Sequence, residues 1–79
     1  MTKTIEVFEF HRGIDDGFGP FVTVDDYKAF IGDKRVGFVR VTRYHTEDME
    51  GRIFTKEVTE EKQLDSEEVR RAIYQSIGG

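Results

Sequence analysis

Apolar and polar residues alternate along four segments of the chain, the pattern of β-strands whose two faces meet different surroundings. The segments cover residues 4–11, 21–31, 34–45 and 52–59. Residues 34–45 are rich in β-branched and aromatic side chains and predict a long, bent central strand, in which Gly37 marks a bulge or a close approach. Residues 52–59 carry charged outer positions, as expected of an edge strand.

The sequence predicts a strand over residues 4–11 and a loop over residues 12–20. Residues 4–11 place apolar groups on both faces, which favours a central or bulged strand. Residues 12–20 contain three glycines and the only proline, and we expect the main loop there. Within this loop, Ile14 and Phe18 either cover an edge of the core, which we favour, or form an exposed binding tip.

Residues 21–31 allow two interpretations. A helix could begin near Thr23 and end at Gly32, with Val24, Tyr27 and Ile31 on one face. A strand would instead turn at Gly32-Asp33 into residues 34–45 as a hairpin. The hairpin is favoured because it sets Ala29 opposite Val36 and Tyr27 opposite Phe38, which are good cross-strand pairs.

The last segment predicts an amphipathic helix. Asp65 and Glu68 have the spacing of a capping box, and Leu64 and Val69 that of a hydrophobic staple. One helical face is apolar, and Gly78 is placed to end the helix. The apolar face consists of Val69, Ala72, Ile73 and Ile77, and the outer face carries Arg70, Arg71 and Tyr74.

These elements predict an α+β fold, a small antiparallel sheet of three to four strands in a meander with a C-terminal helix packed on one face. The length of 79 residues fits a single domain over residues 1–79. The absence of cysteine excludes disulfides and thiolate metal sites and suits a reducing compartment, so we expect a cytoplasmic protein. No apolar run has the length of a signal peptide or membrane span.

The sequence contains no motif that predicts an enzyme, a cofactor or a metal site. An enzyme with a nucleophilic mechanism needs an activated side chain such as cysteine or serine. The sequence has no cysteine, and its two serines, Ser66 and Ser76, both fall in the helical segment. His11 and His45 lie near strand ends, where we expect hydrogen-bonded or solvated side chains rather than metal ligands. The pairs Asp15-Asp16 and Asp25-Asp26 lack the spacing of a calcium loop and are interpreted as turn residues.

Charge is distributed unevenly along the chain. The net charge is −4, yet residues 34–45 contain four basic residues and no acid. Arg40 alternates with Phe38 and Tyr44 on one face of this segment, a combination that can bind single-stranded nucleic acid. Pairing of the arginines with facing acids, such as Arg43 with Glu57, is the alternative.

Size and the lack of catalytic motifs favour a non-enzymatic protein-binding or regulatory module. A small accessory product of a phage or bacterium that inhibits a larger protein would have this character. Nucleic-acid binding through residues 34–45 is the alternative, and a homodimer is compatible with so small a core. The candidate partner-binding residues are Phe18, Arg40, Arg43, Tyr44, Arg70, Arg71 and Tyr74.

Overall fold

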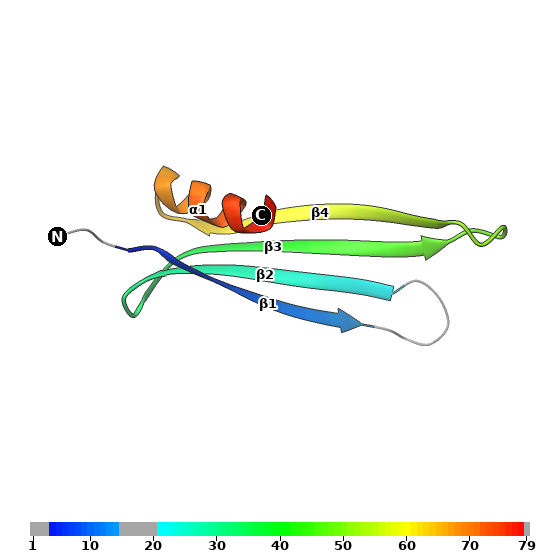
Figure 1. Cartoon of the computed structure of the whole chain (residues 1–79), viewed down its shortest axis with the longest axis horizontal. Coiled ribbons are helices and arrows are strands. Elements are labelled where there is room, and N and C mark those ends of the chain that lie inside the picture. The colour runs from blue at the N-terminus through cyan, green and yellow to red at the C-terminus, as the bar shows by residue number, and fades with distance from the viewer. Residues whose placement is uncertain (1–3, 15–20, 79) are drawn as a thin grey trace.

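The computed structural model describes residues 4–14 and 21–78 and has the predicted α+β fold (Figure 1). All four strands form one antiparallel sheet in the order β1-β2-β3-β4, and α1 packs on one of its faces. The elements are β1 (Glu6–Ile14), β2 (Phe21–Ile31), β3 (Lys34–Glu47), β4 (Ile53–Leu64) and α1 (Glu67–Gly78). The hairpin interpretation of residues 21–31 is therefore confirmed.

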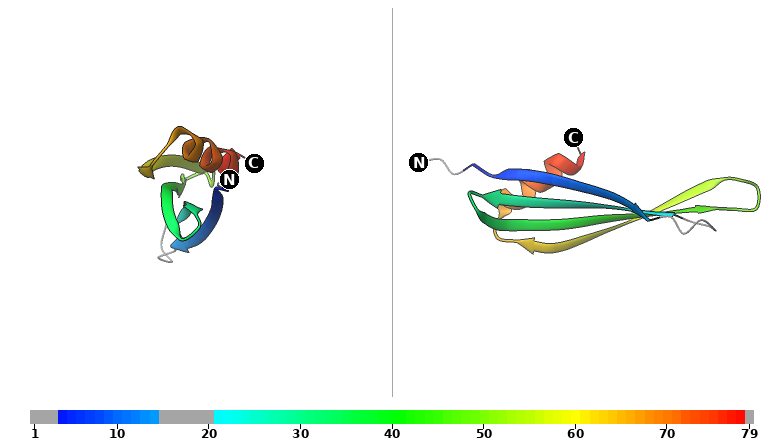
Figure 2. Two further views of the ribbon diagram at one scale, coloured as in Figure 1. Left: turned by 90° about the vertical axis from the view of Figure 1, so that its left-hand side faces the viewer. Right: turned by 90° about the horizontal axis from the view of Figure 1, so that it is seen from below.

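The molecule is long and narrow, with principal extents of 57 × 19 × 18 Å. The strands run along the long axis and twist, while α1 lies over one end of the sheet only (Figures 1 and 2). The radius of gyration is 15.6 Å, against about 12 Å for a compact domain of this length. A long sheet covered by one short helix leaves most of both sheet faces without a second layer.

The hydrophobic core lies between α1 and the nearby ends of the strands. Val69 and Ile73 of α1 are fully buried against the sheet, and Ile77 packs beside them, as the helical pattern predicted. The sheet contributes the remaining members of this buried cluster, which are Tyr27, Ala29, Val36, Val39 and Val41. Each fully buried aliphatic side chain contributes about 1.5–3 kcal/mol, so this small cluster supplies much of the stability.

Gly37 is the point of closest approach between α1 and β3. A Cβ atom at this position would lie 2.5 Å from Val69 Cγ1 and 2.7 Å from Ile73 Cδ1. Both distances are far below van der Waals contact, so only glycine fits here without moving the helix. The close approach predicted for this glycine is confirmed.

The predicted register of the β2–β3 hairpin is wrong by one residue beyond the turn. Gly32 turns the chain with a φ of 61°, and Ile31 pairs with Lys34 as expected. A bulge then follows at Val36, so that Ala29 pairs with Gly37 and Tyr27 with Val39. The Val36 carbonyl accepts the Asp65 amide at 3.0 Å, which ties the bulge to the connection before α1.

The helix begins one residue later than the predicted capping box. Ser66 is the N-cap, since its hydroxyl accepts the Val69 amide at 3.2 Å. The Asp65 carboxylate instead accepts from the Gln63 side chain at 3.2 Å. Serine and aspartate cap equally well, and the choice follows from the backbone of Asp65, which is held by the bulge.

Two expectations about the first strand are also wrong. β1 continues to Ile14 and pairs with β2 as far as Val22, so residues 12–14 belong to the sheet and not to the loop. β1 is moreover an edge strand, like β4, for which the edge position was predicted. Its apolar residues on both faces reflect a sheet that α1 covers on one side, while Phe8 and Phe10 remain exposed on the other.

Candidate binding surface

The face of the sheet opposite α1, here called the open face, has no covering element among residues 4–14 and 21–78. Side chains alternate between the two faces of each strand, so the strand register assigns its members. They are Glu6, Phe8, Phe10, Arg12, Val22, Val24, Asp26, Lys28, Phe30, Arg35, Phe38, Arg40, Thr42, Tyr44, Thr46, Phe54, Lys56, Val58, Glu60 and Gln63.

Large aromatic side chains stand exposed on the open face. Phe10 and Phe54 are 54% and 56% exposed, and Phe8 and Tyr44 are each more than 40% exposed. Phe8 packs edge-on against Phe30, with ring centroids 5.8 Å apart. Exposed apolar surface of this kind, gathered on one face, is typical of a binding surface.

Cations lie among these rings. The Lys28 ammonium is 5.2 Å from the Phe10 ring centroid and 5.3 Å from that of Phe38. The guanidinium groups of Arg35 and Arg40 lie 5.4 and 5.5 Å from the same Phe38 ring. These distances are within the range of cation–π attraction, so the cations are held over the surface of the sheet.

Two carboxylates of the open face are already neutralised by neighbours. Arg40 donates two hydrogen bonds to Asp26, at 2.8 and 3.3 Å, and Lys62 lies 2.5 Å from Glu60. The hydrogen bond from Arg40 lowers the pKa of Asp26 and raises the pKa of Arg40. In contrast, no carboxylate of the described residues lies within 4.0 Å of Lys28, Arg35 or Lys56.

The Asp26–Arg40 pair predicts an acid-dependent stability. A carboxyl group whose pKa is lower in the folded chain stabilises the fold above its unfolded-state pKa, and that contribution is lost as the pH falls through the folded-state pKa. We therefore expect Asp26→Asn to be less stable than the parent chain at pH 7, with a difference that shrinks below a pH of about 4. Urea unfolding across this pH range measures it, and a pH-independent difference would contradict the assignment.

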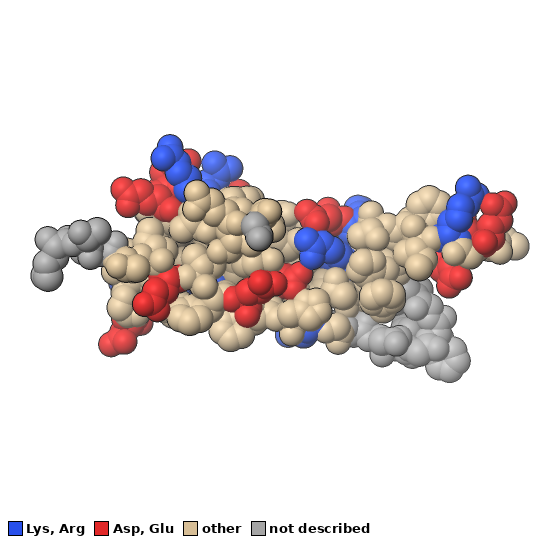
Figure 3. Space-filling model, in the orientation of Figure 1, with Lys and Arg blue, Asp and Glu red and all other residues tan. Residues whose placement is uncertain are grey.

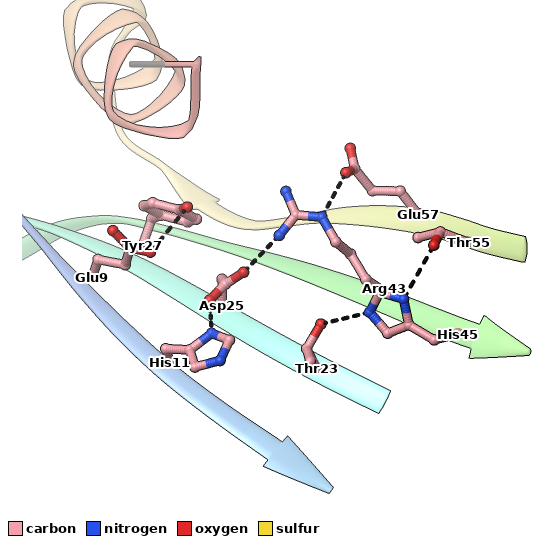
Figure 4. A network of polar contacts seen from close by, with 9 residues as sticks. All are labelled: Glu9, His11, Thr23, Asp25, Tyr27, Arg43, His45, Thr55 and Glu57. Carbon is pink, nitrogen blue, oxygen red and sulfur yellow. Dashed lines mark hydrogen bonds and ion pairs between the residues drawn. The ribbon is translucent and has the colours of Figure 1, made fainter. Parts of the chain in front are cut away.

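On the other face, beyond the end of α1, polar side chains form a second cluster around Asp25 (Figure 4). Asp25 is 4% exposed, and its carboxylate contacts His11 Nδ1 and accepts from Arg43 Nη1 at 2.8 Å. Arg43 also donates to Glu57 at 3.0 Å, which raises the pKa of Arg43. Tyr27 donates to Glu9 at 3.4 Å, and burial raises the pKa of Tyr27.

Both histidines make hydrogen bonds, as expected from the sequence. His45 contacts the Thr55 and Thr23 hydroxyls at 3.1 and 3.4 Å and stacks on Phe21. Within the described part of the chain, no three His, Cys, Asp or Glu side chains are grouped so as to hold a metal ion. The cluster around Asp25 joins all four strands, and we interpret it as structural.

The paired aspartates at 25 and 26 are not turn residues, which corrects that interpretation. They lie in the middle of β2 and point to opposite faces of the sheet, where each meets an arginine of β3. Alternation along a strand separates neighbouring side chains in this way. The other pair, Asp15-Asp16, lies outside the described residues.

The predicted partner-binding residues do not form one surface. Arg40 and Tyr44 are on the open face, whereas Arg43 is on the opposite face and pairs with Glu57, the acid considered for it. On α1, Tyr74 donates a hydrogen bond to Glu61 at 2.8 Å, and this bond raises the pKa of Tyr74. The Arg70 guanidinium lies 3.7 Å from the Glu67 carboxylate, and Arg71 is exposed. Phe18 lies outside the described residues.

Several members of the open face were missed as candidates. Phe8, Phe10, Lys28 and Phe54 share the same sheet face as Arg40 and Tyr44. The alternation of β1 separates Phe8 and Phe10 from Ile5 and Val7, and this signal could have identified them. Figure 3 shows charged side chains around α1, in the middle of the molecule and at the β3–β4 turn.

Comparisons with protein-family models, with curated proteins and with solved structures found no match to this chain. No helix of the described residues is long and apolar enough to cross a membrane.

Proposed function

We propose that this chain is a non-enzymatic binding module that acts by placing its open face against a larger protein. The observation that carries the proposal is the amount and position of exposed surface. The chain exposes 5983 Å², whereas a compact monomer of 9.2 kDa exposes about 4,900 Å². The elongated sheet thus exposes on the order of 1,000 Å² more than a compact fold of this mass, and part of this surface is the open face. One partner buries about 800 Å² in a standard interface.

The composition of the open face supports the same proposal. Interfaces are enriched in aromatic residues and arginine, and a few such side chains carry most of the binding energy. Phe10, Tyr44 and Phe54 provide exposed rings, and Arg40 is held in place by Asp26. Regulation or inhibition of the larger protein, as by a phage or bacterial accessory product in the cytoplasm, is part of the proposal and fits the absence of cysteine.

A capture experiment with a matched variant tests this function. The parent chain and the double variant Phe10→Ala/Phe54→Ala are immobilised and exposed to the same bacterial lysate. Both rings are more than half exposed, so their removal should leave the fold intact, which circular dichroism checks. We expect a protein that the parent chain retains and the variant binds at least tenfold more weakly, since central aromatic side chains contribute about 2 kcal/mol or more.

The variant Arg70→Ala/Arg71→Ala is the control, because it changes the outer face of α1 and leaves the open face unaltered. If Arg70→Ala/Arg71→Ala weakens retention of the protein and Phe10→Ala/Phe54→Ala does not, the contact lies on α1 and not on the open face. If the parent chain retains no protein, or if both variants retain as much protein as the parent chain, the proposed function is wrong.

A further inference from the structure

We infer that the open face also binds single-stranded nucleic acid. This inference rests on the charges of the open face and not on its area, so it stands or falls independently of the protein partner proposed above. A protein and a nucleic acid would compete for the same surface.

The first step is the imbalance of charge on the open face. Asp26 is neutralised by Arg40 and Glu60 by Lys62, so the field of these carboxylates is largely cancelled. Lys28, Arg35 and Lys56 have no carboxylate within 4.0 Å among the described residues. The open face therefore carries more cations than carboxylates, although the whole chain carries a net charge of −4. The cations are Arg12, Lys28, Arg35, Arg40 and Lys56, and the carboxylates are Glu6, Asp26 and Glu60.

Many of the acids responsible for that net charge lie elsewhere. Glu57 and Glu61 of β4 are on the other sheet face, and Glu67 and Glu68 are in the first turn of α1. Exposed charges separated by more than about 10 Å are largely screened at 0.1 M salt. Because side chains alternate between the two faces of a strand, Glu57 and Glu61 point away from the open face, and a phosphate bound there lies nearer to the cations of that face.

The second step is the arrangement of rings and cations. Phe10, Tyr44 and Phe54 are more than 40% exposed and can stack on bases, while Lys28 and Lys56 can reach phosphates beside them. Phe38 and Tyr44 are six residues apart on β3, which corresponds to about 20 Å along the sheet. Rings along an uncovered sheet face, flanked by cations, suit a single strand whose bases are unpaired.

A single strand offers unpaired bases to the exposed rings and phosphates to the cations, whereas a duplex would hide its bases from those rings. A second copy of this chain would bring the same unpaired cations together. Charge and stacking together therefore favour single-stranded nucleic acid over a duplex or a second copy of this chain.

Fluorescence anisotropy with a labelled oligothymidylate of about 15 nucleotides tests the inference, beside a duplex of equal length and a single-stranded oligouridylate. We expect single strands to bind at low salt at least tenfold more tightly than the duplex. Three phosphate contacts predict a slope of log K against log salt of about −2.

The variant Lys28→Gln/Lys56→Gln should reduce this slope by about 1.4 and weaken binding about tenfold. Phe54→Ala should weaken it about five- to tenfold with the slope unchanged, because it removes stacking and no charge. Arg70→Gln/Arg71→Gln removes the same charge from α1 and should bind like the parent chain.

Each contrary result overturns the inference. These are an absence of binding at low salt, equal binding of the duplex, and loss of binding in the α1 variant and not in the open-face variants. Light scattering completes the test, because a dimer that Phe54→Ala dissociates would show that a second copy occupies the open face. The oligonucleotide results do not decide the outcome of the lysate experiment, so the two proposals fail separately.

Discussion

Replacement of Gly37 by valine should displace α1 from the sheet and lower the free energy of unfolding by about 2–3 kcal/mol. Even a single added carbon would lie 2.5 Å from Val69 and 2.7 Å from Ile73. Those two side chains are 1% and 0% exposed, so they can yield only by opening the core that they form with β3. Urea unfolding followed by circular dichroism measures the change.

Gly13→Ala provides the matched control. Gly13 is also in a strand, but no atom lies within 4 Å of a Cβ built there. Its replacement by alanine should change stability by less than about 0.5 kcal/mol. If Gly37→Val were as stable as Gly13→Ala, α1 would not be seated on Gly37, and the core described above would be wrong.

Local patterns along the chain predict most of the fold. Alternation identified the strands, Gly32 marked the hairpin turn with its positive φ, and the spacing of Val69 and Ile73 identified the buried face of the helix. These features depend on neighbours in sequence, which is why a single sequence reveals them.

The features that were not predicted depend on contacts between distant residues. The bulge at Val36 shifts the pairing of Ala29 by one residue, and it coincides with a hydrogen bond from Asp65. The same bond makes Ser66 the N-cap in place of Asp65. Neither the bulge nor the cap follows from local propensity, because each is set by where β4 ends beside β3.

The candidate site was only partly predicted, because it too depends on contacts between residues that are distant in sequence. The alternation of Arg40 with Tyr44 pointed to the open face, but the face acquires its character from strands that the sheet brings together. Lys28 lies between Phe10 and Phe38, which belong to different strands on either side of it. Such a contact becomes visible only once the register is known.

The cluster around Asp25 leads to a second prediction with a large effect. Arg43→Met should lower the free energy of unfolding by about 3 kcal/mol. Arg43 is the only arginine within 4.0 Å of the Asp25 carboxylate among the described residues, at 2.8 Å, and the Asp25 side chain is 5% exposed. Methionine keeps much of the apolar stem, so the loss reports chiefly on a buried carboxylate that has lost its arginine and keeps only its contact with His11. Urea unfolding at pH 7 measures the loss.

Arg70→Met is the control, because Arg70 is half exposed and its nearest carboxylates lie 3.7 and 3.9 Å away. It should cost less than about 1 kcal/mol. Adding Asp25→Asn to Arg43→Met should recover part of the loss, because the amide carries no charge to leave unpaired. If Arg43→Met were no more destabilising than Arg70→Met, or if the double variant were less stable than the single one, the buried pair would not stabilise the fold. The stability of the sheet beyond α1 would then rest on its apolar side chains and backbone hydrogen bonds alone.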